Sequence, residues 1–436
     1  MKRIFLVVAL GMFATVSFAQ KKAIKEAKSE IKKNTAEARA LIKPALTNPE
    51  TMNDPEAWKV AGDIEYTAFD KEREAELTES VTQKKANYDL MYEGLYNLYE
   101  PYIKADSLGE FPDEKGKIKN KFRKDIIKTF KEVHPFYING GAYFNDKKDY
   151  AKAADFFARY WEMPKLAVLK GDADGGIVVV DSLYNTIKYY AVITAIQSGN
   201  TNRAITYLKN IINEGYVPNS TYKESDPYEL LASEYLQVGD SANFLATLRA
   251  GAERFPSNQY FTPNLINEFI KAGKKKEAID YIDQAISNDP ANACNLYSVK
   301  GSLFADSEQK DYENAESAYK QALSADANCE NALSGIGVVY ILQAQDLKDQ
   351  AGQTTNKSVM RELDAQTADL YSKALPFLEK CYDLAKARNA KPEDLRPVLI
   401  RLQNVYYNLS LLNIDKSTDV DRVTKELEDI KNELGY

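Results

Sequence analysis

The 436-residue sequence predicts an all-α protein built from stacked pairs of antiparallel helices. Four observations lead to this fold class. Apolar residues recur at three- and four-residue spacing over long segments, which is the period of an amphipathic helix. Short turns containing Gly, Pro, Asn or Asp separate these segments. The one run of β-branched residues, at 177–180, has no obvious partner strand, and a similar order of small and aromatic residues returns along the chain.

The first residues of the chain have the pattern of a secretory signal peptide. Lys2 and Arg3 precede an apolar run that ends at Val16, and the small residues Ser17 and Ala19 stand where a signal peptidase would cut. We expect cleavage after Ala19 and a soluble periplasmic or secreted protein. A retained membrane anchor is the alternative, but the run is too short to span a bilayer comfortably, so no stable membrane insertion is expected.

The composition argues against a nucleic-acid partner. The chain has 57 basic and 64 acidic residues, and without the two basic residues of the leader its formal charge is −9. Phosphate recognition needs clustered positive charge. The two basic stretches, at 115–128 and 274–276, are interleaved with or followed by acids, which favours solvated helix faces.

Four segments follow from these patterns. They are the leader at 1–19, an N-terminal helix or cap at 20–50, a repeat array at 51–385 that is clearest at 225–385, and a C-terminal helical cap at 392–436. We expect the first cap to form a helix over 21–42 that Pro44 ends, and the second to contain an amphipathic helix over 419–434. Polar outer faces on terminal elements keep an open stack soluble.

The array is defined by the spacing of small and aromatic residues. In one of its clearest units, Leu231, Ala232 and Tyr235 precede a turn at Gly239. A similar order returns at Trp58 and Gly62; Gly141, Phe144, Ala153 and Phe157; Gly199, Ala204, Leu208 and Ile211; Ile266, Phe269, Gly273, Ala278 and Ile282; Gly301, Ala315, Tyr319 and Ala322; Leu333, Ile336, Gly337 and Tyr340. A small residue where two helices cross lets their axes approach, and an aromatic residue one turn away fills the gap.

This order resembles the tetratricopeptide repeat family, and with the leader it is similar to a bacterial exported member. The resemblance covers roughly residues 54–385 and is strongest over 228–340. It implies a right-handed superhelical stack of helix pairs, a solenoid with irregular insertions. We expect an extra loop around 165–181 and a polar insertion at about 343–367 that lengthens one helix pair.

The residue inventory offers little for catalysis. The single histidine, His134, precedes a proline, which favours a turn or helix-entry role over that of a general base. One histidine cannot build a Ser-His-Asp, Cys-His or His-metal site unless other side chains substitute, and no phosphate-binding glycine loop occurs. We therefore expect no enzyme activity and no cofactor. An enzyme using paired carboxylates stays as a third alternative.

The same inventory predicts no metal site. Residues 171–176 suggest the start of a calcium loop, but Gly176 stands where a ligand is needed and no bidentate Glu follows, so a flexible turn is favoured. Cys294 and Cys329 fall at similar points of neighbouring repeats, which leaves one disulfide conceivable. Small buried side chains are the favoured interpretation, because Cys381 stands where other repeats place a packed apolar residue.

Tyrosine and serine each carry two interpretations. Tyr235, Tyr319 and Tyr340 coincide with packing positions, so a core role is favoured for them over ligand contact. The Asp-Ser strings that contain Ser107, Ser182 and Ser241 resemble the acceptor pattern of a bacterial O-glycosylation system. Asp-Ser pairs also cap helices, and capping is the favoured interpretation.

The family resemblance also implies where a partner binds. In such proteins the first helix of each pair lines a concave groove. Carried onto this sequence, the contact positions are Glu229, Ser233, Tyr260, Asn267, Lys271, Ser298, Ser302, Asn331, Ser334 and Val338. Only Asn267 and Lys271 match the carboxylate clamp of the family's chaperone-tail binders, so such a clamp is not expected.

Two functions follow from these observations. The first is an exported scaffold that binds protein or peptide partners through the groove without catalysis. The alternative, motivated by the 29 tyrosines and the leader, is an envelope-associated carbohydrate-binding accessory protein.

Overall fold

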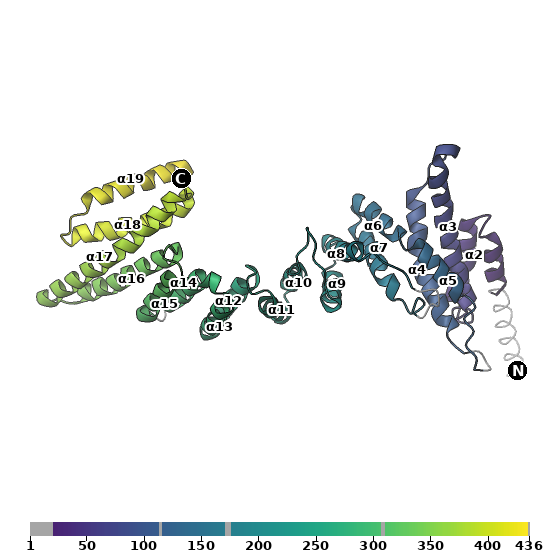
Figure 1. The fold of residues 1–436 in the computed structure, drawn as a ribbon, viewed down its shortest axis with the longest axis horizontal. Helices are drawn as coiled ribbons and strands as arrows, with labels where there is room; N and C mark the ends of the chain where they lie inside the picture. The colour runs from purple at the N-terminus through teal and green to yellow at the C-terminus, as the bar shows by residue number, and fades with distance from the viewer. Residues whose placement is uncertain (1–20, 113–115, 171–175, 307–309, 435–436) are drawn as a thin grey trace, which may run out of the picture. The chain divides into compact units, whose positions relative to one another are not determined.

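The computed structural model describes residues 21–112, 116–170, 176–306 and 310–434. The predicted leader and its cleavage point lie outside these residues. All regular elements within them are α-helices or short 3₁₀-helices, which confirms the predicted fold class (Figure 1). The described part of the chain contains no helix long and apolar enough to cross a membrane.

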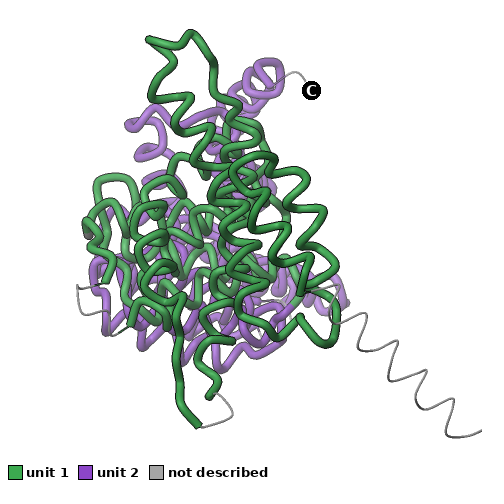
Figure 2. Tube along the Cα trace, turned by 90° about the vertical axis from the view of Figure 1, so that its right-hand side faces the viewer, with its two compact units in different colours: residues 1–239 green, residues 240–436 purple. Residues whose placement is uncertain are grey.

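The chain forms two compact units, Met1–Gly239 and Asp240–Tyr436, which Figure 2 colours separately. The border between them falls inside the array predicted for 51–385. In the first unit, residues 21–30 are helical and are followed by α2 (Thr35–Thr47), α3 (Pro55–Thr82), α4 (Tyr88–Gly109), α5 (Arg123–Val133), α6 (Phe136–Asp146), α7 (Tyr150–Glu162), η1 (Met163–Lys165), α8 (Asp181–Gln197), α9 (Thr201–Glu214) and α10 (Asp226–Gln237).

The second unit continues the same alternation of helices and short turns. Its elements are α11 (Ser241–Arg254), α12 (Phe261–Lys271), α13 (Lys275–Asn288), η2 (Pro290–Asn292), α14 (Ala293–Ala305), α15 (Tyr312–Ala325), α16 (Glu330–Gln353), α17 (Lys357–Ala387), α18 (Pro392–Leu411) and α19 (Ser417–Leu434). Consecutive helices pack on each other, and α14 also packs directly on α16, the first helix of the next pair.

The N-terminal helix differs from the prediction. Residues 21–30 form one helix, the chain turns at 31–34, and α2 then runs through Pro44 to Thr47. Asn34 starts α2, because its side-chain oxygen accepts a hydrogen bond from the amide of Glu37 at 3.2 Å. Pro44 cannot donate a hydrogen bond, but its carbonyl accepts one from the Asn48 amide at 3.2 Å, so the last turn persists beyond it.

Helix pairs are joined by a turn that recurs in the array. Gly199 and Gly239 have φ of +71° and +72°, a left-handed conformation that glycine adopts without steric cost. The residue that follows each glycine, Asn200 or Asp240, accepts a hydrogen bond from the amide three residues further on and so starts the second helix. The turn between the two helices is therefore defined by a glycine and by the capping residue that follows it.

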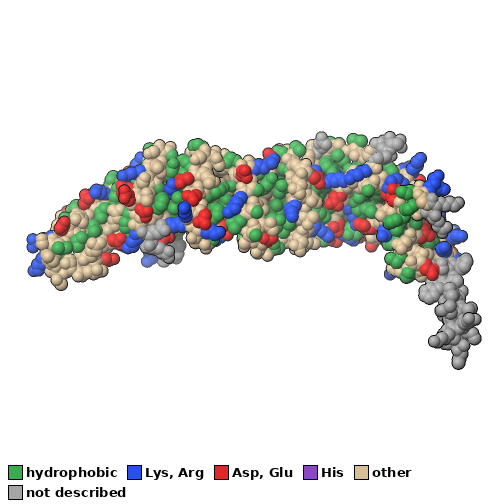
Figure 3. All heavy atoms as spheres, turned by 90° about the horizontal axis from the view of Figure 1, so that it is seen from below, with side chains coloured by type: hydrophobic (Ala, Val, Ile, Leu, Met, Phe, Trp, Pro, Cys, Tyr) green, Lys and Arg blue, Asp and Glu red, His purple; other side chains and the backbone are tan. Residues whose placement is uncertain are grey.

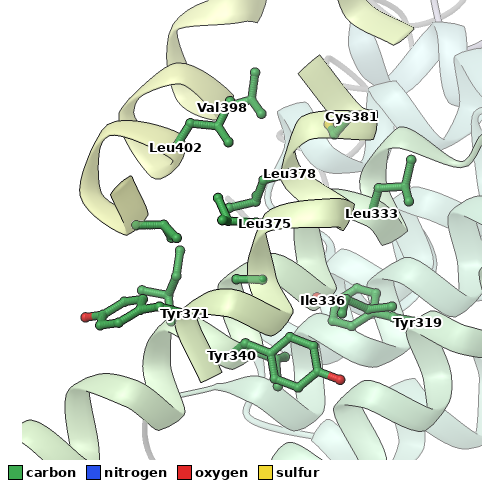
Figure 4. Close-up of a cluster of buried hydrophobic side chains, with 14 of the residues drawn as sticks. Tyr319, Leu333, Ile336, Tyr340, Tyr371, Leu375, Leu378, Cys381, Val398 and Leu402 are labelled. Carbon is green, nitrogen blue, oxygen red and sulfur yellow. The ribbon is translucent and has the colours of Figure 1, made fainter. Parts of the chain in front are cut away.

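The predicted small and aromatic positions meet in the core of the second unit (Figure 4). Tyr319 on α15 is 5 % exposed, and its ring lies against Gly301 on α14 and Gly335 on α16. A Cβ atom at either glycine would stand 2.8 or 2.3 Å from that ring, closer than carbon atoms pack. Tyr235 and Tyr340 are also buried, which confirms the core role predicted for all three tyrosines.

Both expected insertions are present. The helices α16 and α17 extend beyond their neighbours and are joined by a short turn at 354–356, inside the polar segment predicted to lengthen a pair. In the segment where the extra loop was expected, residues 166–170 and 176–180 belong to no helix or strand. The terminal helix α19 covers the predicted range of 419–434 and begins slightly earlier, at Ser417.

Candidate functional site

A groove of about 490 Å³ opens on the second unit over α12, α14 and α16. Its lining residues share one property, which is that none of them carries a charge, although 28 % of the chain is charged. They are Gln259, Pro263, Ile266, Asn267, Asn292, Asn295, Leu296, Ser298, Val299, Ser302, Tyr319 and Asn331. Side-chain amides and hydroxyls thus stand beside an apolar floor.

The amides form a row across neighbouring helices. Asn331, in the first turn of α16, donates a hydrogen bond to the Asn295 side-chain oxygen on α14 at 3.3 Å. Asn295 in turn donates to the side chain of Asn292 at 3.2 Å. Asn267 on α12 is exposed, and its side-chain amide makes no hydrogen bond with another described residue. Because each amide has two hydrogens and two lone pairs, the row keeps donors and acceptors for a ligand.

Two serine hydroxyls complete the polar lining. Ser298 donates to the carbonyl of Cys294 and Ser302 donates to the carbonyl of Val299, each at 2.7 Å. The Ser302 side chain is exposed, so its hydroxyl oxygen is left as a hydrogen-bond acceptor, whereas Ser298 is 7 % exposed and its oxygen also lies 3.6 Å from the Cys329 sulfur.

A disulfide joins Cys294 and Cys329, with Cα atoms 6.0 Å apart. The favoured prediction that these residues are unbridged is therefore wrong, and the alternative that equivalent points of neighbouring repeats form a bridge is correct. Cys294 lies in the first turn of α14 and Cys329 directly precedes α16, so the bond ties the starts of the two helices that carry Asn295 and Asn331. Cys381 is buried, as predicted, and is not part of a disulfide.

The structure brings four of the predicted contact residues into this groove, namely Asn267, Ser298, Ser302 and Asn331. Ser334 lies in an adjoining hollow of about 290 Å³, which also includes Asn331, and accepts a hydrogen bond from Arg401 at 2.9 Å. The two hollows therefore meet at Asn331.

The remaining predicted positions lie outside the groove lining. Lys271 is on α12, but its ammonium group pairs with Glu268 of the same helix at 2.7 Å. Tyr260 directly precedes α12 and packs edge-to-face on Phe261, and Val338 is half-buried on α16. Glu229 and Ser233 belong to α10 and thus to the other compact unit.

Sequence reasoning missed Gln259, Asn292 and Asn295 as groove residues. The cysteines did not mark Asn295 either, because Asn295 follows Cys294 by one residue whereas Asn331 follows Cys329 by two. Asn292 and Gln259 precede their helices, so helix periodicity alone did not place them.

The residues considered for catalysis or metal binding, His134 and the calcium-like run at 171–176, form no further site among the described residues. His134 is 4 % exposed, its Nε2 lies 2.8 Å from the Tyr160 carbonyl oxygen, and its ring stacks on Tyr160 at 4.1 Å. Residues 171–175 of the calcium-like run lie outside the described part of the chain. Among the described residues, no group of His, Cys, Asp and Glu is arranged to hold a metal ion.

The three serines of the Asp-Ser strings are exposed near helix ends. Ser107 lies in the last turn of α4, while Ser182 and Ser241 lie in the first turns of α8 and α11. Asp240 caps α11 through the amide of Asn243 at 3.1 Å, as the capping interpretation predicts. Modification of these serines stays a prediction.

Charged side chains of both signs are mixed on the face shown in Figure 3. Many charged side chains of the described residues form ion pairs, such as Lys300 with Asp283 at 2.6 Å and Arg388 with Glu330 at 2.8 Å. Mixed and paired charges give no extended basic track on this face, in agreement with the composition.

Comparisons with known proteins give one direct family match. Residues 296–329, which cover most of α14 and all of α15, match the model described as tetratricopeptide repeat. No curated protein matches the chain.

Solved structures of repeat proteins are only distantly similar. The C-terminal part of a TPR repeat-containing protein from Cytophaga hutchinsonii is 14 % identical, with 67 % of this chain and 94 % of that chain covered and a TM-score of 0.40. A tetratricopeptide repeat protein from Parabacteroides merdae is 12 % identical over 56 % of this chain and 98 % of its own, with a TM-score of 0.28. The TPR2AB domain of yeast Sti1, solved as a complex with pHSP90, is 14 % identical over 64 % of this chain and 99 % of its own, with a TM-score of 0.23. These scores are too low to support conclusions about ligands.

Proposed function

We propose that this tetratricopeptide-repeat chain is an exported scaffold that holds a protein or peptide partner in the groove lined by α12, α14 and α16. One observation carries the proposal. The groove gathers Asn267, Ser298, Ser302 and Asn331, four positions at which the family resemblance implies partner contacts. The 34-residue family match covers most of α14, one of the helices that line the groove, and all of α15.

A peptide fits this groove better than a carbohydrate does. A tyrosine ring can offer its apolar face to a sugar. Tyr319 is the only aromatic side chain lining the groove, and it is 5 % exposed because Gly301 and Gly335 cover its ring. The groove therefore lacks an open aromatic platform, whereas its amide row suits the hydrogen-bonding groups of a polypeptide.

Two features support the export part of the proposal. The first is the leader pattern that ends at Ala19. The second is the Cys294–Cys329 disulfide, since such bonds persist in oxidising compartments such as the periplasm and are rare in the cytosol.

The experiment compares capture of envelope proteins by the full chain and by an Asn267→Ala/Asn331→Ala double variant. Each lost hydrogen bond typically costs about 0.5–1.5 kcal/mol, so we expect partner capture to fall about tenfold. The readout is quantitative mass spectrometry after crosslinking, and circular dichroism checks that helicity is unchanged.

Lys271→Ala is the matched control. This residue lies on α12 one turn beyond Asn267, but it is exposed and pairs only within its own helix, so its variant should capture partners as the wild type does. Wild-type capture by the Asn double variant would reject the groove. Saturable binding to a glycan array without a protein partner would favour the carbohydrate alternative.

A further inference from the structure

We infer that the groove selects an extended stretch of polypeptide whose side chains are uncharged, and that binding is insensitive to salt. This inference rests on the proposed function and specifies the chemistry of the partner. It starts from the neutral lining of the groove. The chain has 121 charged residues, yet none of the twelve residues that line the groove is charged.

Three basic side chains near the groove are paired with acids outside it, while Arg401 in the adjoining hollow donates to the Ser334 hydroxyl. Lys300 on α14 binds both carboxylate oxygens of Asp283 on α13, at 2.6 and 2.8 Å. Lys271 pairs with Glu268, and Arg388 holds Glu330 through two nitrogen–oxygen contacts. A charged ligand side chain would lose water in the groove without gaining a counter-ion there, which is unfavourable.

The amide row matches the backbone of an extended segment. A primary amide presents an N–H donor and a C=O acceptor, the same two groups that a peptide unit presents. A bound helix would already use these groups in its own hydrogen bonds, whereas an extended chain leaves them open along its edges. Asn267 has both groups open, and Asn331 keeps one hydrogen and its oxygen after bonding to Asn295.

The apolar floor limits the side chains that fit. Ile266 and Leu296 are 3 % and 5 % exposed, so they form a closed surface rather than a deep cavity for a large side chain. Successive side chains of an extended segment point to opposite sides, so every second one would face this floor. Small apolar residues at those positions match the surface.

The test screens the full chain against a library of random twelve-residue peptides with blocked termini. We expect the enriched peptides to be depleted of Asp, Glu, Lys and Arg relative to the library. Their Kd should change by less than about twofold between about 50 and about 500 mM NaCl, because screening weakens only interactions between charges. Asn267→Ala/Asn331→Ala should raise Kd about tenfold.

A designed charge gives a matched pair of variants. Ser302→Lys places an ammonium group in the groove, and we expect it to shift selection to acidic peptides whose Kd rises with salt. Ser324→Lys is the control, because Ser324 is also exposed and also bonds to its own helix backbone, through the Lys320 carbonyl at 2.9 Å, but lies outside the groove. It should leave selection unchanged, and equal thermal melting of both variants confirms folding.

The outcomes separate the two proposals. Enrichment of charged peptides that still depend on Asn267 and Asn331 would overturn the present inference and leave the peptide-binding function standing. Enrichment that ignores both asparagines, or no enrichment at all, would overturn the groove function and this inference with it.

Discussion

His134 shows how one residue can make a helical unit sensitive to acid. The ring is enclosed between α5 and α7, where it stacks on Tyr160 and bonds to that residue's carbonyl. Burial lowers the pKa of His134 below its usual value of 6.5, while the backbone hydrogen bond opposes the change. The folded chain therefore favours the neutral imidazole.

The sign of the pH effect follows from this shift. Below the pKa of an unfolded histidine, the unfolded chain binds a proton that the folded chain resists, so the free energy of unfolding falls as pH drops from about 7 to about 5. His134→Gln removes the titrating group and should flatten this part of the profile while lowering stability overall. Urea denaturation of both proteins at several pH values measures the difference. Parallel profiles would contradict the role of the imidazole.

At the scale of elements, the disulfide links the starts of α14 and α16 covalently. The bond connects two residues that are 35 apart in sequence, one at the start of α14 and one directly before α16. Cys329 also lies 3.6 Å from the Ser298 hydroxyl oxygen, so the bridge contacts a residue that lines the groove. Its loss should affect both stability and the amide row.

Cys294→Ser/Cys329→Ser should lower the free energy of unfolding by about 3–4 kcal/mol, the value expected when a loop of this length is no longer closed in the unfolded chain. Chemical denaturation monitored by circular dichroism measures it. A dithiol reductant should weaken the wild type to a similar extent and leave the double variant unaffected. Equal stability of the two oxidised proteins would argue against this account.

Local signals made most elements predictable. Gly199 and Gly239 marked turns because their conformation suits glycine, and Tyr319 was placed in the core because its spacing from Gly301 follows the repeat. Pro44 misled the prediction, since proline disturbs only the hydrogen bonds on its N-terminal side. Such rules act within a few residues, which is why they can be read from sequence.

The site was predictable only in part, because it depends on how neighbouring pairs stack. Asn267 and Asn331 could be placed from the repeat register. The position of Asn292 in the groove depends on the short helix η2 before α14, and the disulfide depends on two Cα atoms lying 6.0 Å apart. The periodicity of a single helix predicts neither feature.

At the scale of the whole molecule, the groove belongs entirely to the unit formed by residues 240–436. Export of the chain is a separate property and needs a separate test. We expect the mature protein to begin at Gln20, because Ser17 and Ala19 satisfy the small-residue rule for cleavage.

Mass spectrometry of the protein from cell-envelope and culture fractions identifies that terminus. Ala19→Arg removes the small residue at the cleavage point and should leave the uncleaved chain in the membrane fraction, whereas a conservative Ala19→Ser change should be processed normally. Recovery of the wild-type chain in the cytosol with residues 1–19 attached would refute export.

The buried ring of Tyr319 acts as a spacer between two helices of the groove. It comes from α15, behind the groove, yet it lies between the glycines of α14 and α16 and keeps these two helices at a set separation. The width available to a ligand is thus decided by a side chain beneath the contact surface. Evolution could retune which partners fit by changing the size of this one spacer, with every amide on the rim left as it is.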